Sequence, residues 1–143
     1  NKNHSFTAYA DIPAEGAEGV LVAAGGLYGG YALYVDDNRL VYEYNAYNET
    51  RSIIKSESPL PGGEVEMKAV YGVNEDKTGT VTLFVNGKQV AQGPVTRTHP
   101  GQFSLSETFD VGEDTGTPVS KNYTRDNKFS GALDRLVVSL EQN

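Results

Sequence analysis

Apolar and polar residues alternate along most of this chain, a period of two that is typical of strands with one buried face. A first strand is predicted before Pro13 and Gly16, because four apolar residues share one side of it. These residues are Phe6, Ala8, Ala10 and Ile12. The continuous apolar run over 20–24 predicts a second strand that is buried on both faces. No stretch has the three-to-four residue spacing of an amphipathic helix, so the pattern indicates an all-β chain.

Two hairpins give the strongest local signals. Residues 31–35 and 40–44 alternate around Asp36-Asp37-Asn38, and residues 81–85 lead into Asn86-Gly87. Asp, Asn and Gly tolerate the positive φ that tight hairpin turns require. We therefore expect antiparallel strand pairs at both places.

Further strands are predicted over 50–55 and 64–73, separated by a break at Pro59 to Gly63. Apolar alternation returns at Phe103, Leu105 and Phe109, then again in a final strand. That strand carries Leu136, Val138 and Leu140 on one face. About ten short strands favour a two-sheet antiparallel sandwich, because each sheet must bury one apolar face.

Composition narrows the classes of function. With 143 residues the chain is interpreted as one domain over 1–143, and its net charge of −7 disfavours nucleic-acid partners. It has no cysteine, hence no disulfide or thiolate metal site. No apolar run reaches the roughly 18 residues of a membrane helix, so no membrane partner is expected. The start at Asn1 suggests a processed protein or an excised domain.

A family resemblance covers nearly the whole chain. Residues 18–26 and 29–35, the hairpin at 79–88, and the long motif at 103–119 resemble the C-terminal β-sandwich of one group of bacterial arylsulfatases. The resemblance implies a concanavalin A-like or laminin G-like jelly roll. It also implies a catalytic domain as partner, because the Cys/Ser-x-Pro-x-Arg motif and metal ligands of sulfatases are missing here. The first hypothesis is thus a non-catalytic accessory domain of an arylsulfatase-like protein.

Tyrosines gather around the first hairpin and suggest an alternative function. A tyrosine ring packs on the apolar face of a sugar while its hydroxyl forms a hydrogen bond, so a carbohydrate-binding module for a polysaccharide is plausible. Leu40, Tyr42 and Tyr44 share one side of their strand, which fits cross-strand core packing equally well. The candidate ligand-binding residues are Tyr31, Tyr34, Tyr42 and Tyr44.

The loop that follows Phe109 is the second candidate site. Asp110, Glu113 and Asp114 offer the oxygen ligands that Ca²⁺ prefers, although acidic turn residues more often cap backbone amides. Together with Thr115 and Thr117 the same side chains form a motif for docking against a neighbouring domain. Apart from this calcium candidate, no cofactor is expected.

An enzyme on a jelly-roll scaffold is the third hypothesis. His4 and His99 stand in no ligand or triad spacing, and no serine has a nucleophile-elbow context. Glu64 and Glu66 alternate on one strand and resemble a paired carboxylate, but a solvated strand face explains them better. The sequence therefore favours binding or docking over catalysis.

Overall fold

The computed structural model describes residues 4–26, 29–46, 50–73, 79–95, 109–111 and 128–140. These ranges form ten strands and no helix. The strands are β1 (His4–Ile12), β2 (Gly19–Gly26), β3 (Gly29–Asp36), β4 (Arg39–Ala46), β5 (Thr50–Lys55), β6 (Gly63–Val73), β7 (Gly79–Val85), β8 (Lys88–Val95), β9 (Phe109–Val111) and β10 (Ala132–Leu140).

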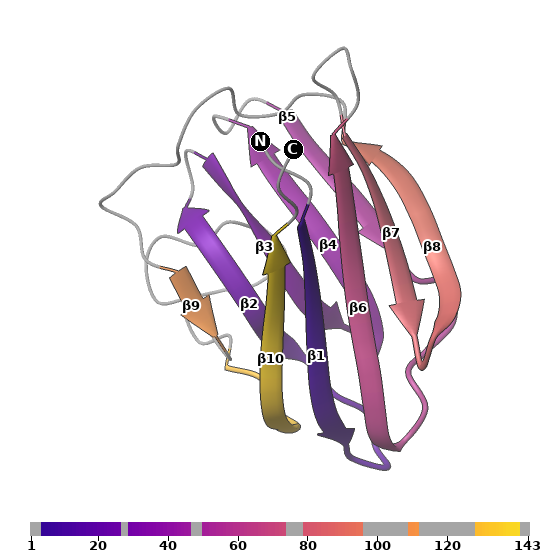
Figure 1. The fold of residues 1–143 in the computed structure, drawn as a ribbon. Helices are drawn as coiled ribbons and strands as arrows, with labels where there is room; N and C mark the ends of the chain where they lie inside the picture. The colour runs from indigo at the N-terminus through magenta and orange to yellow at the C-terminus, as the bar shows by residue number, and fades with distance from the viewer. Residues whose placement is uncertain are drawn as a thin grey trace.

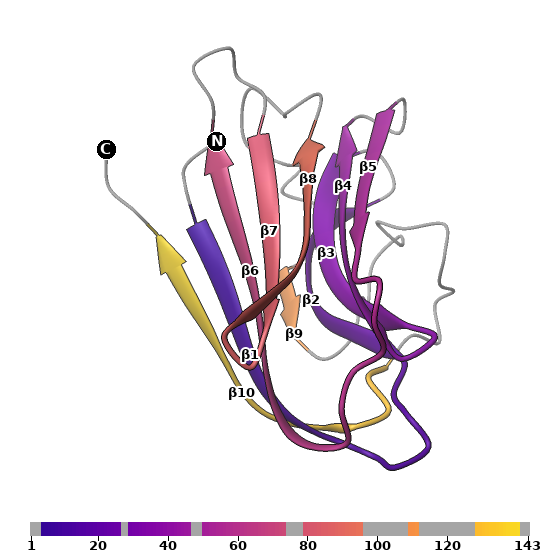
Figure 2. The same cartoon turned by 90° about the vertical axis from the view of Figure 1, so that its right-hand side faces the viewer.

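The strands form two antiparallel sheets of five strands each. The first sheet has the order β10-β1-β6-β7-β8, and the second has the order β5-β4-β3-β2-β9. Figure 1 shows the first sheet in front of the second, and Figure 2 shows the two layers from the side. The predicted two-sheet sandwich is confirmed.

The main core lies between the sheets and follows the predicted alternation. Phe6, Ala8, Ala10 and Ile12 of β1 are all at most 4% exposed. They pack with inward residues of the other strands in one apolar cluster. Alternate residues of β6 also point inward, as predicted: Val65, Met67, Ala69 and Tyr71.

Both predicted hairpins have turns with left-handed backbone. Asp37 and Asn38 have φ of 52° and 56°, and Asn86 and Gly87 have φ of 52° and 81°. Positive φ at both central positions is the signature of type I′ turns. The first turn is one residue shorter than predicted, because Asp36 already pairs with Arg39.

The second sheet is buried on its outer face as well as its inner one. Val20, Leu21, Val22 and Ala23 are all 0% exposed, as the continuous apolar run predicts. A bulge at Leu21 turns both Leu21 and Val22 toward the main core. A second apolar cluster therefore lies on the outer face, formed by Val20, Ala23, Ala32, Tyr34 and Val41.

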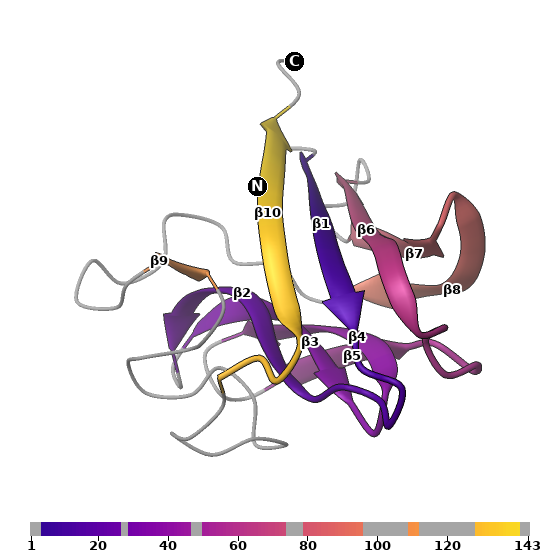
Figure 3. The same ribbon diagram turned by 90° about the horizontal axis from the view of Figure 1, so that it is seen from below.

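The sandwich is tight at one side and open at the other. At the tight side β5 packs on β8, where a Cβ at Gly93 would lie 2.8 Å from Cγ1 of Ile54. In Figure 2, β10 and β1 lean away from the second sheet toward their upper ends. Val138 pairs with the core residue Phe6 at this end but is 43% exposed. The edge strand β10 is thus only partly covered. Figure 3 shows this strand at the end of the first sheet, next to β1.

Residues 128–130 connect the open edge back to the second sheet. Lys128 forms a parallel bridge with Val20, and the Ser130 amide donates to the Glu18 carbonyl at 2.8 Å. The Ser130 hydroxyl in turn accepts from the Glu18 amide at 2.9 Å. These contacts hold the crossing segment, residues 128–130, against the second sheet just before β10 begins.

Candidate ligand-binding sites

Three of the four predicted tyrosines meet between the sheets. Tyr31 and Tyr44 are direct partners across β3 and β4, and Tyr42 lies two residues before Tyr44 on the same face. The rings of Tyr31 and Tyr42 are nearly parallel, with centroids 6.3 Å apart. From the sequence, these tyrosines could either bind a sugar or pack in the core. The structure places their rings inward, between the sheets.

Sequence reasoning missed two members of this cluster, because they come from the opposite sheet. Tyr71 of β6 faces Tyr44 with ring centroids 6.3 Å apart. His4 pairs with Tyr71 across β1 and β6, and their rings stack with centroids 4.7 Å apart. For Tyr71, the sequence contains one indication of an inward position: it alternates with Val65, Met67 and Ala69 on one face of a predicted strand.

The cluster keeps its phenols protonated. Burial, followed by the charge of nearby Tyr44, raises the pKa of Tyr31 to about 12. Burial, followed by the charges of Tyr31, Tyr71 and Tyr44, raises the pKa of Tyr42 well above its usual value of about 10. Burial and then Tyr44 likewise raise the pKa of Tyr71. All three are neutral hydrogen-bonding groups at physiological pH.

These raised pKa values predict alkaline instability. The unfolded chain ionises its tyrosines near pH 10, whereas the folded chain holds these three protonated. Their contribution to stability is therefore complete below about pH 10 and is lost as pH rises through the higher folded values. Absorbance titration at 295 nm should show a fraction of tyrosines that ionises only when circular dichroism reports unfolding. Ionisation of all nine tyrosines at about pH 10 in the folded protein would contradict this prediction.

The hypothesis of an open, sugar-stacking tyrosine face is wrong for Tyr34, Tyr42 and Tyr44. Tyr42 is 0% exposed, Tyr34 is 2% exposed and Tyr44 is 3% exposed, so their rings offer no face to a sugar. Tyr34 does not even join the others, because it points to the outer side of the second sheet. Strand alternation shows which of these tyrosines share a face, but it does not show whether that face is buried or exposed.

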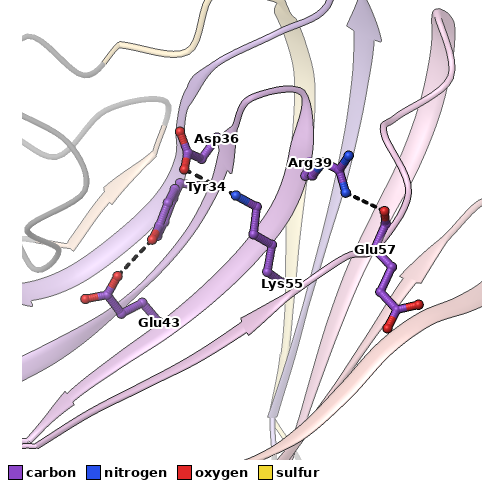
Figure 4. Close-up of polar contacts among 6 residues, drawn as sticks. All are labelled: Tyr34, Asp36, Arg39, Glu43, Lys55 and Glu57. Carbon is purple, nitrogen blue, oxygen red and sulfur yellow. Dashed lines mark hydrogen bonds and ion pairs between the residues drawn. The ribbon is translucent and has the colours of Figure 1, made fainter.

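Tyr34 instead forms a buried polar contact. Its hydroxyl donates to Oε1 of Glu43 at 2.8 Å, and Glu43 is only 1% exposed (Figure 4). Two polar contacts near the β3–β4 turn are exposed by comparison. Lys55 forms an ion pair with Asp36 at 3.5 Å, and the Arg39 guanidinium donates a hydrogen bond to the Glu57 carbonyl. The Tyr34–Glu43 contact therefore belongs to the packing of the outer cluster.

A polar groove lies on the outer face of the first sheet. It encloses about 660 Å³ and is formed where β10, β1 and β6 lie side by side. Its polar side chains are Tyr9, Asp11, Glu64, Glu66, Asn86 and Asp134. Glu64 and Glu66 thus occupy an outward strand face, as predicted, but within a concave site.

Strand register explains why these groups converge. Tyr9 is the partner of Glu66 on one side and of Arg135 on the other, and Asp11 is the partner of Glu64. A bulge between Tyr9 and Ala10 adds Asp134 to the rim. The Arg135 guanidinium lies 4.2 Å from the centroid of the Tyr9 ring and holds it in place. The groove therefore combines four carboxyl groups, an aromatic ring and an amide.

The β10 edge carries the other unusual surface. Val137 is 46% exposed and Val138 is 43% exposed. They are neighbours on the strand, so they face opposite sides of the first sheet. The edge strand thus presents apolar surface on both faces.

The acidic loop motif falls largely beyond the described ranges. Asp110 lies in β9 and pairs with Ala23, while Glu113, Asp114, Thr115 and Thr117 are outside the residues that the structure describes. His99 is outside them as well. Within the described ranges, no group of three or more acidic or histidine side chains is placed to hold a metal ion. The calcium and loop-docking hypotheses stay predictions.

Comparison with solved structures identifies the fold. Sheep galectin-11, solved in complex with glycerol, matches with a TM-score of 0.51 and 14% identity, covering 96% of this chain and 90% of its own. A native heptameric pentraxin from Limulus polyphemus matches at 0.38 and 13% identity, over 97% of this chain and 83% of its own. No protein-family description and no curated protein matches the sequence.

This chain is a concanavalin A-like β-sandwich. The galectin match extends over nearly all of both chains, so the likeness concerns the whole sandwich rather than one hairpin. The jelly-roll prediction is therefore confirmed. In the part of the chain that the structure describes, no helix is long and apolar enough to cross a membrane.

Proposed function

We propose that this chain is a non-catalytic carbohydrate-binding module whose ligand occupies the groove on the outer face of the first sheet. The observation that carries this proposal is the groove itself, with its carboxyl groups, its amide and the ring of Tyr9. Carboxylate and amide oxygens accept hydrogen bonds from sugar hydroxyls, and apolar side chains contact the C–H faces of a sugar ring. The likeness to galectin-11 supports the sandwich as a scaffold for such a site.

The charge of the groove selects the class of glycan. Asp11, Glu64, Glu66 and Asp134 line it, and the nearby cation Arg135 is already placed over Tyr9. Like charges brought together on binding cost several kcal/mol. We therefore expect neutral oligosaccharides to bind and densely sulfated ones to be rejected.

Removing two carboxylates should weaken binding without unfolding the domain. In the double variant Glu64→Gln and Glu66→Gln, each lost charged hydrogen bond costs about 1.5–3 kcal/mol, which is roughly ten- to hundredfold in affinity. Calorimetric titration with neutral oligosaccharides measures the change. The double variant Glu15→Gln and Glu57→Gln is the matched control, because it removes the same charge from exposed positions outside the groove. Equal affinities for both double variants would exclude the groove as the binding site.

A second function is favoured by the β10 edge: an accessory domain that docks on an arylsulfatase-like catalytic domain. The motifs at 18–26, 29–35, 79–88 and 103–119 resemble the domain that follows such a catalytic domain. Exposed valines on an edge strand are surface that a partner buries, either by packing or by adding a strand. The two functions are compatible, because the groove and the two exposed valines are different parts of the surface.

The docking hypothesis predicts a selective loss of association. Replacing Val137 and Val138 with serine should weaken binding to an arylsulfatase catalytic domain of this group at least tenfold in analytical ultracentrifugation. Burying two valines contributes about 1.5–3 kcal/mol for each side chain. Ile53→Ser is the control, because Ile53 is 50% exposed but lies on β5 at the opposite edge. Association that survives the double serine variant would place docking elsewhere.

A further inference from the structure

A second concavity lies farther along the outer face of the first sheet. It encloses about 400 Å³ and is lined by residues of β1, β6 and β10, the three strands that also form the groove. Ser5 and Lys68 point outward here, because their chain neighbours Phe6 and Met67 are buried in the main core. We call this concavity the Lys68 pocket.

The groove and the Lys68 pocket adjoin each other. On β1, the outward row of residues runs from Ser5 in the pocket through Thr7 to Tyr9 in the groove, about 13 Å at roughly 3.3 Å per residue. On β6, Glu66 of the groove pairs with Tyr9. The next outward residue of β6 is Lys68, which pairs with Thr7. One extended ligand can therefore contact both sites.

The two sites carry opposite charge. Four carboxyl groups line the groove, whereas none of the described residues that line the Lys68 pocket is acidic. Among the described residues, the Lys68 ammonium has no ion-pair partner. The hydroxyls of Ser5 and Ser139, which are cross-strand partners, add hydrogen-bond donors to the pocket. An anionic group is therefore favoured in the pocket and disfavoured in the groove.

The surface beside Lys68 suits a sugar ring as well as an anion. Phe84 of β7 is the cross-strand partner of Lys68 and is partly exposed. It points outward, because Leu83 beside it is buried in the main core. Side chains of directly paired residues lie close together, so the apolar ring of Phe84 borders the ammonium group. A sugar that carries a negative charge can contact both.

We propose that the ligand is an oligosaccharide that is neutral where it crosses the groove and carries one anionic group, which the Lys68 pocket binds. This inference rests on the proposed function, because the groove must hold the neutral part of the chain. A carboxylate or a single sulfate ester on one sugar supplies such a group. A densely sulfated chain does not fit, because it would bring negative charge to the groove as well.

Matched hexasaccharides test the proposal by calorimetric titration. The neutral parents are hexasaccharides of β-linked glucose, mannose and galactose, and each is compared with two isomers that carry a carboxylate at C6 of one terminal sugar. One isomer should bind about three- to tenfold more tightly than its parent, a gain between those of an exposed ion pair and a charged hydrogen bond. The other isomer should bind more weakly, because its carboxylate lies at the groove. The same chains with one terminal 6-sulfate show which of the two anions is preferred.

The variant Lys68→Gln should abolish the gain and leave the affinity for the neutral parent little changed. Lys128→Gln is the matched control, because Lys128 is an exposed lysine outside the residues that line either site. Added salt should also reduce the gain, since it screens an attraction between exposed charges.

The outcomes separate this inference from the proposed function. If a neutral parent binds and neither charged isomer binds more tightly, or if the gain survives Lys68→Gln, the inference is overturned and the groove remains a site for neutral glycans. If no neutral parent binds, or if its affinity is unchanged by Glu64→Gln with Glu66→Gln, the proposed function fails and the inference fails with it.

Discussion

Replacing Gly19 with alanine is expected to lower the free energy of unfolding by about 2–5 kcal/mol, the sum of backbone strain and overpacking. Gly19 has φ of +108°, a conformation that residues with a side chain rarely adopt. A Cβ there would lie 2.5 Å from the Lys128 carbonyl oxygen and 2.6 Å from Cα of Phe129. Both neighbours are backbone atoms of the crossing segment, so neither moves without disturbing the start of β10.

Alanine substitutions at three other glycines distinguish the effect of backbone strain from that of overpacking. Gly72→Ala has neither positive φ nor a close neighbour and should change little, while Gly63→Ala and Gly87→Ala have positive φ with open space around them. Those two should cost about 1–2 kcal/mol from strain alone. Urea unfolding followed by circular dichroism measures all four. If Gly19→Ala is no more destabilising than Gly63→Ala, then the crossing segment is not packed against β2 as described.

Replacing Phe6 with alanine should cost about 3–5 kcal/mol, because it removes a large side chain from a site that cannot collapse. Phe6 is 1% exposed on β1, with β10 on one side and β6 on the other. Its ring lies 5.2 Å from His4 and 5.3 Å from Tyr31, centroid to centroid. The cavity would therefore open directly beside the aromatic cluster. Differential scanning calorimetry should show a correspondingly lower melting temperature.

Phe6→Leu is the matched control, because it keeps an apolar side chain of intermediate size. It should lose clearly less stability than Phe6→Ala. Equal losses in the two variants would mean that the aromatic contacts, rather than the volume of the ring, determine the contribution of Phe6.

The fold was predictable because its signals are local. Alternation in β1 and β6, the continuous run in β2, and Asn86-Gly87 each depend on neighbouring residues alone. The length of the first turn was predicted one residue too long, because pairing of Asp36 with Arg39 is decided by register rather than by residue type.

The candidate sites were harder to predict because they depend on what lies opposite each strand. Tyr34 and Tyr42 are both tyrosines of one hairpin, yet one joins the outer cluster and the other joins the main core. The groove is made by Tyr9, Glu66 and Asp134, which are distant in the sequence and meet only through the register of β1 with β6 and β10. No local pattern contains that information.

Magnetic resonance titration of the isotope-labelled chain with neutral oligosaccharides tests the central proposal most directly. We expect saturable shifts of the backbone amides around Tyr9, Asp11, Glu64 and Glu66, and no shift with a densely sulfated oligosaccharide at the same concentration. Shifts confined to residues outside the groove, or no shift with any neutral glycan of a broad set, would contradict it.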